Sequence, residues 1–175
     1  MAIQGRILIF SGSGKGKTSA AIGTCIRAIG NGMVCALINF LKAGISGEHY
    51  TLERLEIPYL VSGGGWVKDG PTPNDMMWGA KGITAVKAYF ANTSVTKNID
   101  LLVLDEVITA IELKVLDIEQ VRELIASKPQ GMHLILTGRG PWEKLEDLAD
   151  TITVMQDVKH IYDVNKTSAA IGIEY

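Results

Sequence analysis

Short runs of apolar residues alternate along the chain with longer segments in which apolar residues recur every three or four positions. The first pattern is typical of strands buried on both faces, and the second of helices that pack one face on a core. It predicts strands at residues 6–10, 34–40, 57–61, 100–104, 132–137 and 152–155, and helices at 18–29, 48–55, 74–90, 117–126 and 142–149. Because strands and helices alternate, the sequence predicts an α/β fold with a mainly parallel sheet.

Local signals mark the ends and the weak points of three of these helices. Asp117 is expected to cap the fourth predicted helix, with Gln120 at the capping-box position. Residues 30–32, Gly-Asn-Gly, are expected to end the first helix in a left-handed conformation. Gly79 and Gly82 weaken the third helix, because each costs about 1 kcal/mol relative to alanine.

Glycine is plentiful, with 19 residues in a chain of 175. It follows no fixed period, which excludes collagen-like and solenoid repeats. Instead the glycines gather at residues 12–16, 30–32, 63–65 and 138–140, and each cluster marks a tight turn or a close approach of another group to the backbone. The length predicts one domain over residues 1–175.

Charge and hydropathy narrow the classes of partner. The 17 basic and 19 acidic side chains nearly cancel, and this disfavours nucleic acid, whose sequence-independent binding needs a strong positive field. No apolar run approaches 18 residues, and the first residues lack the basic-then-apolar layout of a signal peptide. We therefore expect a cytoplasmic protein without a membrane partner. Cys25 and Cys35 match no zinc or redox spacing and are expected to fill the core.

The strongest chemical signal is the segment Ser-Gly-Ser-Gly-Lys-Gly-Lys-Thr at residues 11–18, between the first predicted strand and helix. We call it the phosphate loop. Its glycines let successive backbone N–H groups surround phosphate oxygens, and the helix N-terminus adds the positive end of its dipole. Lys17 supplies a charge to the phosphates, and the Thr18 hydroxyl suits Mg²⁺. Ser11 stands where the usual pattern begins with glycine, but the remaining glycines still permit the turns.

A second signal is the apolar strand at residues 100–104, which leads into Asp105 and Glu106. In phosphate-loop proteins a strand beside the first delivers a carboxylate to the Mg²⁺ of the nucleotide, so we expect these two strands to be neighbours. Adjacent residues of a strand point to opposite sides. The pattern therefore leaves open whether Asp105 or Glu106 faces the metal.

Two arginines are further candidates for nucleotide contact. Arg27 lies on the first helix, and Arg139 lies in the turn after a strand, where ligand sites of open α/β sheets gather. Arg54 and Arg122 are expected on solvated helix faces. No lid and no base for a phosphate acceptor are marked. Residue chemistry alone thus predicts an enzyme or ATPase that uses a magnesium nucleotide, and leaves a kinase as an alternative.

A longer series of short segments extends this interpretation. In order they are residues 12–21 (GSGKGKTSAA), 27–32 (RAIGNG), 39–42 (NFLK), 103–106 (VLDE), 136–140 (LTGRG), 148–151 (LADT), 158–160 (VKH) and 172–175 (GIEY). From about residue 5 to the C-terminus the chain resembles the ATP-dependent corrinoid (cob(I)alamin) adenosyltransferases of the phosphate-loop type. The resemblance implies a P-loop NTPase-like, RecA-like fold, with a mainly parallel sheet flanked by helices on both faces.

The resemblance also implies a reaction. The Co(I) of a reduced corrinoid would attack the 5′ carbon of ATP, form a cobalt–carbon bond and release triphosphate. Cobalt is the nucleophile, so no side-chain base is expected, and Lys17 would stabilise charge on the leaving triphosphate. ATP is expected at Gly12, Ser13, Gly14, Lys15, Gly16, Lys17, Thr18, Ser19, Arg27 and Arg139. The resemblance assigns Mg²⁺ to Thr18 and Glu106, with Asp105 beside them, and implies a homodimer and an electron donor such as a reduced flavoprotein.

The chain departs from this family at the expected corrinoid surface. Ser13 stands where the family commonly has Asn, and Trp66-Val67-Lys68 stands where it usually has Phe-Thr-Trp. Trp66 is therefore expected to pack on the corrin ring, with Trp78 as a weaker substitute. The altered segment leaves open which corrinoid is used, a complete cobalamin or an intermediate of its synthesis.

Three histidines complete the candidates. His133 is expected inside a core strand, His49 on the surface, and His160 in a Lys-His pair shared with the family. We expect none of them to bind a metal.

Overall fold

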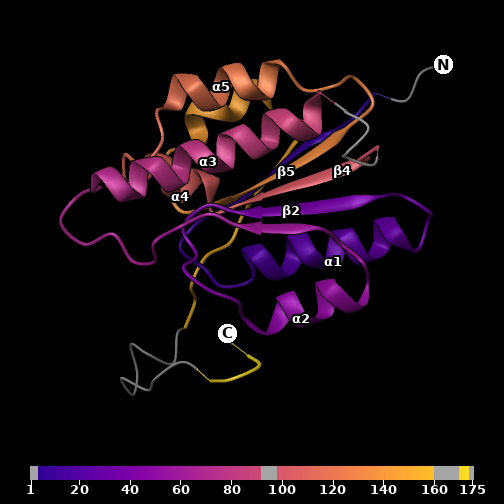
Figure 1. Ribbon diagram of the computed structural model, residues 1–175, viewed down its shortest axis with the longest axis horizontal. Coiled ribbons are helices and arrows are strands. Elements are labelled where there is room, and N and C mark those ends of the chain that lie inside the picture. Colours follow the sequence, from indigo (N-terminus) through magenta and orange to yellow (C-terminus); the bar gives the residue numbers. More distant parts are fainter. Residues whose placement is uncertain (1–3, 92–97, 160–169, 174–175) are drawn as a thin grey trace.

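A single sheet of parallel strands organises the computed structural model, which describes residues 4–91, 98–159 and 170–173 (Figure 1). Its strands are β1 (Ile7–Ser11), β2 (Cys35–Asn39), β3 (Tyr59–Val61), β4 (Leu101–Asp105), β5 (His133–Gly138) and β6 (Thr151–Val154). They lie in the order β3-β2-β4-β5-β1-β6, and every neighbouring pair is parallel. The predicted α/β class and parallel sheet are confirmed.

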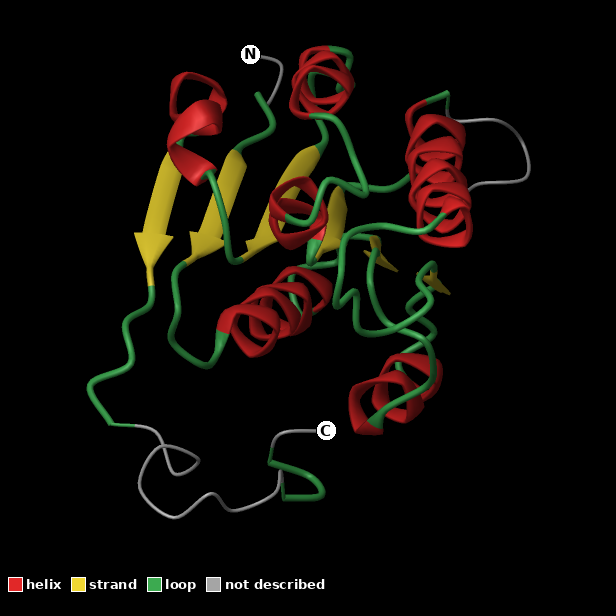
Figure 2. Cartoon of the chain, turned by 90° about the vertical axis from the view of Figure 1, so that its left-hand side faces the viewer, coloured by secondary structure: helices red, strands yellow, loops and turns green. Residues whose placement is uncertain are grey.

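Helices cover both faces of this sheet (Figures 1 and 2). The helices α1 (Lys17–Ile29) and α2 (Gly47–Arg54) lie on one face. The other face carries α3 (Pro73–Phe90), α4 (Val107–Glu112), α5 (Ile118–Ala126) and the 3₁₀ helix η1 (Trp142–Leu148). Among the described residues, none of the helices has the length and apolar character needed to cross a bilayer.

Successive side chains along each strand point to opposite faces of the sheet, and this divides the core into two layers. Leu37, Val103 and Ile135 belong to the apolar cluster beneath α1, whereas their neighbours in the strands pack into the cluster beneath α3, α4 and α5. Every residue of β2 and β4 is buried, as expected for parallel strands covered on both faces. Cys25 and Cys35 are both buried in the α1 layer, so their predicted role as core residues is confirmed.

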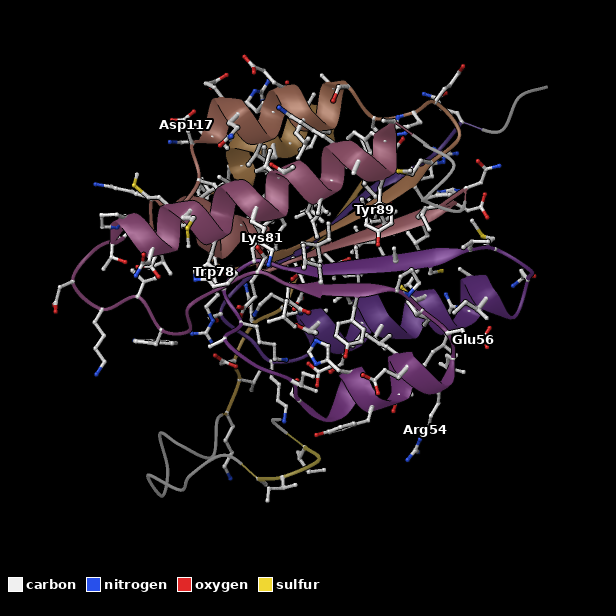
Figure 3. The ribbon with its side chains drawn as sticks, in the orientation of Figure 1. Arg54, Glu56, Trp78, Lys81, Tyr89 and Asp117 are labelled. Carbon is white, nitrogen blue, oxygen red and sulfur yellow. The ribbon has the colours of Figure 1, made fainter. Side chains whose placement is uncertain are left out.

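Most predicted elements are present with ends shifted by a residue or two, but three features differ from the prediction. Helix α4 was not predicted, and the segment expected to be an α-helix at 142–149 is the 3₁₀ helix η1. The expected left-handed end of the first helix within residues 30–32 is confirmed at Gly32, while Gly30 keeps a right-handed backbone with φ of −59°. Strand β4 is not beside β1, because β5 lies between them. The predicted N-cap is confirmed, since the Asp117 side chain accepts the backbone N–H groups of Glu119 and Gln120 (Figure 3).

The two glycines inside α3 let this helix lie close to its neighbours. A Cβ on Gly82 would lie 2.6 Å from the ring of Phe40, which is fully buried. A Cβ on Gly79 would lie 2.9 Å from a methyl group of Val115. The two glycines thus lower the helix propensity of α3 but allow it to pack tightly over β2 and over the turn that follows α4.

We expect Gly82→Ala to lower the free energy of unfolding by about 1–3 kcal/mol, because the added methyl overpacks a filled core. Gly23 in α1 is the matched control. It is exposed, and nothing lies within 4 Å of its Cβ position, so Gly23→Ala should stabilise the protein by about 0.5–1 kcal/mol. Urea unfolding measures both. Stabilisation by Gly82→Ala would contradict the close packing of α3.

Candidate active site

Buried polar side chains gather where the four central strands end. Ser11, Asn39, Asp105 and Thr137 lie at or one residue before the carboxyl ends of β1, β2, β4 and β5, and each is at most 3% exposed. Asn39 lies directly beside Asp105 in the parallel register. Alternation places Asn39, Asp105 and Thr137 on the α1 face. The sheet therefore aims three polar groups at the start of α1, at the edge where open α/β sheets bind ligands.

The phosphate loop is braced by the chain that follows β6. Gly12 and Gly16 have φ values of 103° and 108°, which favour glycine. Cβ atoms on Gly12 or Gly14 would come within 3 Å of backbone atoms of Met155 or Gln156. The Gly14 N–H also donates to the Met155 carbonyl at 2.8 Å. This support was missed from the sequence, because no local pattern connects residue 14 with residue 155.

Lys17 lies across its own loop. Its Nζ donates to the carbonyls of Gly12 at 2.8 Å and Gly14 at 2.6 Å. Burial, followed by the nearby charge of Arg139, lowers the pKa of Lys17 below its ordinary value. The ammonium group is therefore partly desolvated and held by neutral carbonyls, and an anion in the loop would be a stronger partner for it. Ser13, Lys15 and Ser19 are exposed at the same end of α1.

Asp105 is the centre of a hydrogen-bond cluster. Its Oδ1 accepts the hydroxyl of Thr18 at 2.8 Å and that of Thr137 at 2.7 Å. Its Oδ2 accepts the side-chain N–H of Asn39 at 2.8 Å. Thr137 also accepts the backbone N–H of Glu106 at 2.9 Å. The intervening strand β5 thus connects β4 to the loop. No local sequence pattern indicated that Thr137 or Asn39 would take part in the site.

Glu106 lies beside this cluster in an unusual backbone conformation. Its φ of 60° places it in the left-handed region, where the chain leaves β4 and begins α4. Burial and then the charge of Asp105 raise the pKa of the Glu106 carboxyl. Lys42, Lys17 and Arg139 oppose that shift. Two carboxylates and several cations therefore share one end of the sheet, as expected where a charged ligand binds.

A cavity of about 640 Å³ opens from this cluster. Thr18, Asp105 and Glu106 line it, and so do Lys42 and Glu48, which form an ion pair. Gly172 and Ile173 also line it. Lys42 follows the carboxyl end of β2, a position that could have marked it as a site residue. A larger cavity of about 760 Å³ lies at the opposite, amino edge of the sheet and contains none of the predicted site residues.

The two candidate arginines lie in different places. The backbone N–H of Arg139 donates to the Thr109 hydroxyl at 2.9 Å, and the charge of the Arg139 side chain acts on both Lys17 and Glu106. Arg139 is therefore close to the phosphate loop. Arg27 is exposed in the last turn of α1, about 15 Å along the helix axis from Lys17 at 1.5 Å per residue. Within this chain, Arg27 does not join the cavity.

Trp66 extends from the loop between β3 and α3 and is 86% exposed. The glycines before it bring that loop against the end of β2, since a Cβ on Gly63 would lie 2.3 Å from the backbone of Leu41. Trp78 lies on α3 and is half-buried, with the Lys81 Nζ 4.8 Å from its ring centroid (Figure 3). Of the two tryptophans, Trp66 offers far more free aromatic surface.

The expectation that His49 lies on the surface was wrong. Its side chain is fully buried on α2, and its Nε2 lies 3.0 Å from Asn39 Oδ1. His133 begins β5, where it is half-buried, and its Nδ1 accepts the Arg6 N–H at 3.0 Å. His160 lies outside the described residues.

An all-parallel sheet, a glycine-rich loop that opens a helix, and an aspartate hydrogen-bonded to Thr18 together define a P-loop nucleotide-binding protein of RecA-like fold. A crystal structure of a KaiC-like protein from Pyrococcus horikoshii has the same fold, with a TM-score of 0.52 and 18% identity over 90% of this chain and 76% of that one. The sequence model of the ATP:corrinoid adenosyltransferases BtuR/CobO/CobP matches residues 3–175. The chain belongs to this family.

Curated relatives agree with this assignment. The corrinoid adenosyltransferase of Escherichia coli K12 is 32% identical over 174 residues, which cover 98% of this chain and 86% of the relative. The Salmonella typhimurium enzyme is 33% identical with the same coverage. The Pseudomonas aeruginosa enzyme is 34% identical, over 98% of this chain and 84% of the relative. The resemblance recognised in the sequence is confirmed.

We expect Thr137→Val to lower the free energy of unfolding by about 1–3 kcal/mol, because it removes a donor to a buried carboxylate and leaves the Glu106 N–H unpaired. The substitution keeps the shape of the side chain. Thr153→Val on β6 is the control, since Thr153 is exposed. Chemical unfolding of both variants provides the measurement, and equal stabilities would show that Thr137 does not support Asp105.

Proposed function

We propose that this member of the family transfers the 5′-deoxyadenosyl group of ATP to the Co(I) of a reduced corrinoid. An electron pair of cobalt forms the bond to C5′, the bond from C5′ to the triphosphate oxygen breaks, and triphosphate leaves. The observation that carries the proposal is the convergence of Lys17, Thr18 and Asp105 at the carboxyl edge of the sheet. Family membership disfavours the alternative of a P-loop ATPase or kinase.

The proposed ATP site is the phosphate loop and its surroundings. The loop N–H groups and the start of α1 would bind the phosphates, and the Lys17 ammonium would exchange its two carbonyl partners for phosphate oxygens. Arg139 would add a second positive charge from the turn after β5. Because cobalt is the nucleophile, the protein needs to orient ATP, stabilise the leaving triphosphate and exclude water, and it needs no side-chain nucleophile.

We infer that Mg²⁺ accompanies the nucleotide at Thr18, Asp105 and Glu106. A hydroxyl and two carboxylates are hard oxygen donors that suit this ion. In the described part of the chain no three or more His, Cys, Asp or Glu side chains cluster in a way that could hold a metal. The ion would therefore complete its shell with phosphate oxygens and water, and it would neutralise phosphate charge when bound.

The corrinoid is proposed to lie against Trp66. An exposed indole on a loop near the carboxyl edge can bury a large flat ligand. Three further expectations stay predictions that follow from the family resemblance: a homodimer, an electron donor such as a reduced flavoprotein, and a cytoplasmic location.

The product distinguishes the proposed reaction from its alternatives. With Mg-ATP and chemically reduced cobalamin, we expect a light-sensitive alkylcobalamin and one triphosphate for each cobalt alkylated. Lys17→Ala should abolish turnover because it weakens phosphate binding. Absorbance spectra follow the corrinoid, and anion-exchange chromatography separates the phosphates. ADP and orthophosphate as the products would refute adenosyl transfer.

Trp66→Ala should raise the KM for the corrinoid and leave the affinity for ATP unchanged, because the indole lies outside the phosphate loop. Trp66→Phe keeps an aromatic face and is expected to retain most corrinoid use. Steady-state kinetics with each substrate varied in turn measures both effects. If Trp66→Ala has wild-type kinetics, the corrinoid binds elsewhere.

A further inference from the structure

A buried histidine lies behind the Asp105 cluster, and the reaction as proposed gives it no part. His49 is the third residue of α2 and has no solvent exposure. Its ring packs against Tyr59, with centroids 4.6 Å apart. Its Nδ1 lies 3.0 Å from the Ser46 backbone nitrogen, and its Nε2 lies 3.0 Å from Asn39 Oδ1. Both ring nitrogens of this buried side chain therefore have polar partners.

The partners dictate where the ring proton lies. A backbone N–H can only donate, so the Nδ1 of His49 must accept from Ser46. The proton of the neutral ring then lies on Nε2, which donates to Asn39 Oδ1. Burial, and to a smaller extent the charge of Lys42, lowers the pKa of His49 and favours this neutral form.

The donor-to-acceptor direction of these hydrogen bonds continues from His49 through Asn39 to Asp105. Since Asn39 Oδ1 accepts from His49, its amide nitrogen faces Asp105 and donates to Oδ2 at 2.8 Å. If the amide were reversed, two acceptor oxygens would face each other inside the protein. That would cost the buried carboxylate its donor on Oδ2. The hydrogen bonds thus run one way, from the Ser46 backbone through His49 and Asn39 to Asp105.

We propose that Asn39 and His49 are positioning residues for Asp105, and that they orient its carboxylate toward Thr18 and the nucleotide-bound metal. The proposal rests on the proposed Mg-ATP site. With Oδ2 held by Asn39, the Asp105 carboxylate cannot rotate without breaking a buried hydrogen bond, and Oδ1 stays at Thr18. Neither residue touches the cavity, so their effect passes through Asp105. Partners of this outer kind commonly change metal affinity or activity 10–100-fold.

The test compares ATP affinity with and without the metal, measured by calorimetry in Mg²⁺ and in EDTA. His49→Phe keeps a ring against Tyr59 and removes both nitrogens. We expect it to weaken Mg-ATP binding about 10–100-fold, and to leave binding in EDTA unchanged. His49→Gln, whose amide can donate to Asn39 in place of Nε2, should recover most of the affinity. Equal losses under both conditions would mean a merely structural role and would overturn the proposal.

Two controls make the result specific. His133→Phe makes the same chemical change at the amino edge of the sheet and should bind Mg-ATP like the wild type. Thr18→Val removes a proposed metal ligand and should weaken Mg-ATP binding alone. If Thr18→Val has no such effect, the proposed metal site is wrong. If it has that effect and His49→Phe binds like the wild type, only the positioning role is wrong.

A second variant keeps the proposal testable if His49→Phe fails to fold. Asn39→Leu has a similar shape and removes the donor to Asp105, so it should show the same selective loss of Mg-ATP affinity. Where both variants fold by circular dichroism, the double variant should bind no more weakly than Asn39→Leu, because His49 acts only through Asn39. Additive losses of affinity would show that the two residues act independently, and would overturn the proposal that His49 acts on Asp105 through Asn39.

Discussion

The buried carboxylate of Asp105 is the interaction on which the site depends. An ionised carboxylate with 3% exposure is unfavourable unless donors surround it. Here the donors come from α1, β2 and β5, so the carboxylate is satisfied only when these elements are docked against β4. If α1, β2 or β5 were misplaced, the buried Asp105 carboxylate would lose a hydrogen-bond donor. The folded state is therefore stable only when all three elements are correctly placed at the carboxyl edge of the sheet.

This requirement explains how the fold and the chemistry fit together. The apolar layers above and below the sheet supply stability, and alternation along β2, β4 and β5 then puts polar residues on the α1 face at the strand ends. The reaction needs no nucleophile from the protein, but it needs the substrates to be held in the right orientation. A parallel sheet suits that task, because its register places Asn39, Asp105 and Thr137 side by side at one edge.

The sequence predicted most of the fold and the position of the phosphate loop for clear physical reasons. Fully buried strands appear as apolar runs, and the phosphate loop combines several rare features within eight residues. Helix α4 was missed because Val-Ile-Thr-Ala-Ile-Glu is short and rich in β-branched residues, which favour strands. The strand order was missed because the place of β5 depends on pairing between distant segments, which no local pattern records.

The burial of His49 could not be predicted for a related reason. Nothing in the local sequence indicates that the His49 ring points back to Ser46, the N-cap of α2, and also contacts Asn39. Asn39 itself is a polar residue at the end of an apolar strand, and its partner Asp105 is 66 residues further along the chain. Such side-chain networks are decided by register between strands. The register becomes visible only in three dimensions.

The bracing of the phosphate loop by Met155 and Gln156 carries one more consequence. The loop follows β1 and its support follows β6, so two segments that are far apart in the chain meet at the proposed nucleotide site. A ligand that binds only this closed arrangement adds its binding energy to the stability of the folded state as a whole. Nucleotide binding should then stabilise the pairing of β1 with β6, and separation of these two strands would release the ligand.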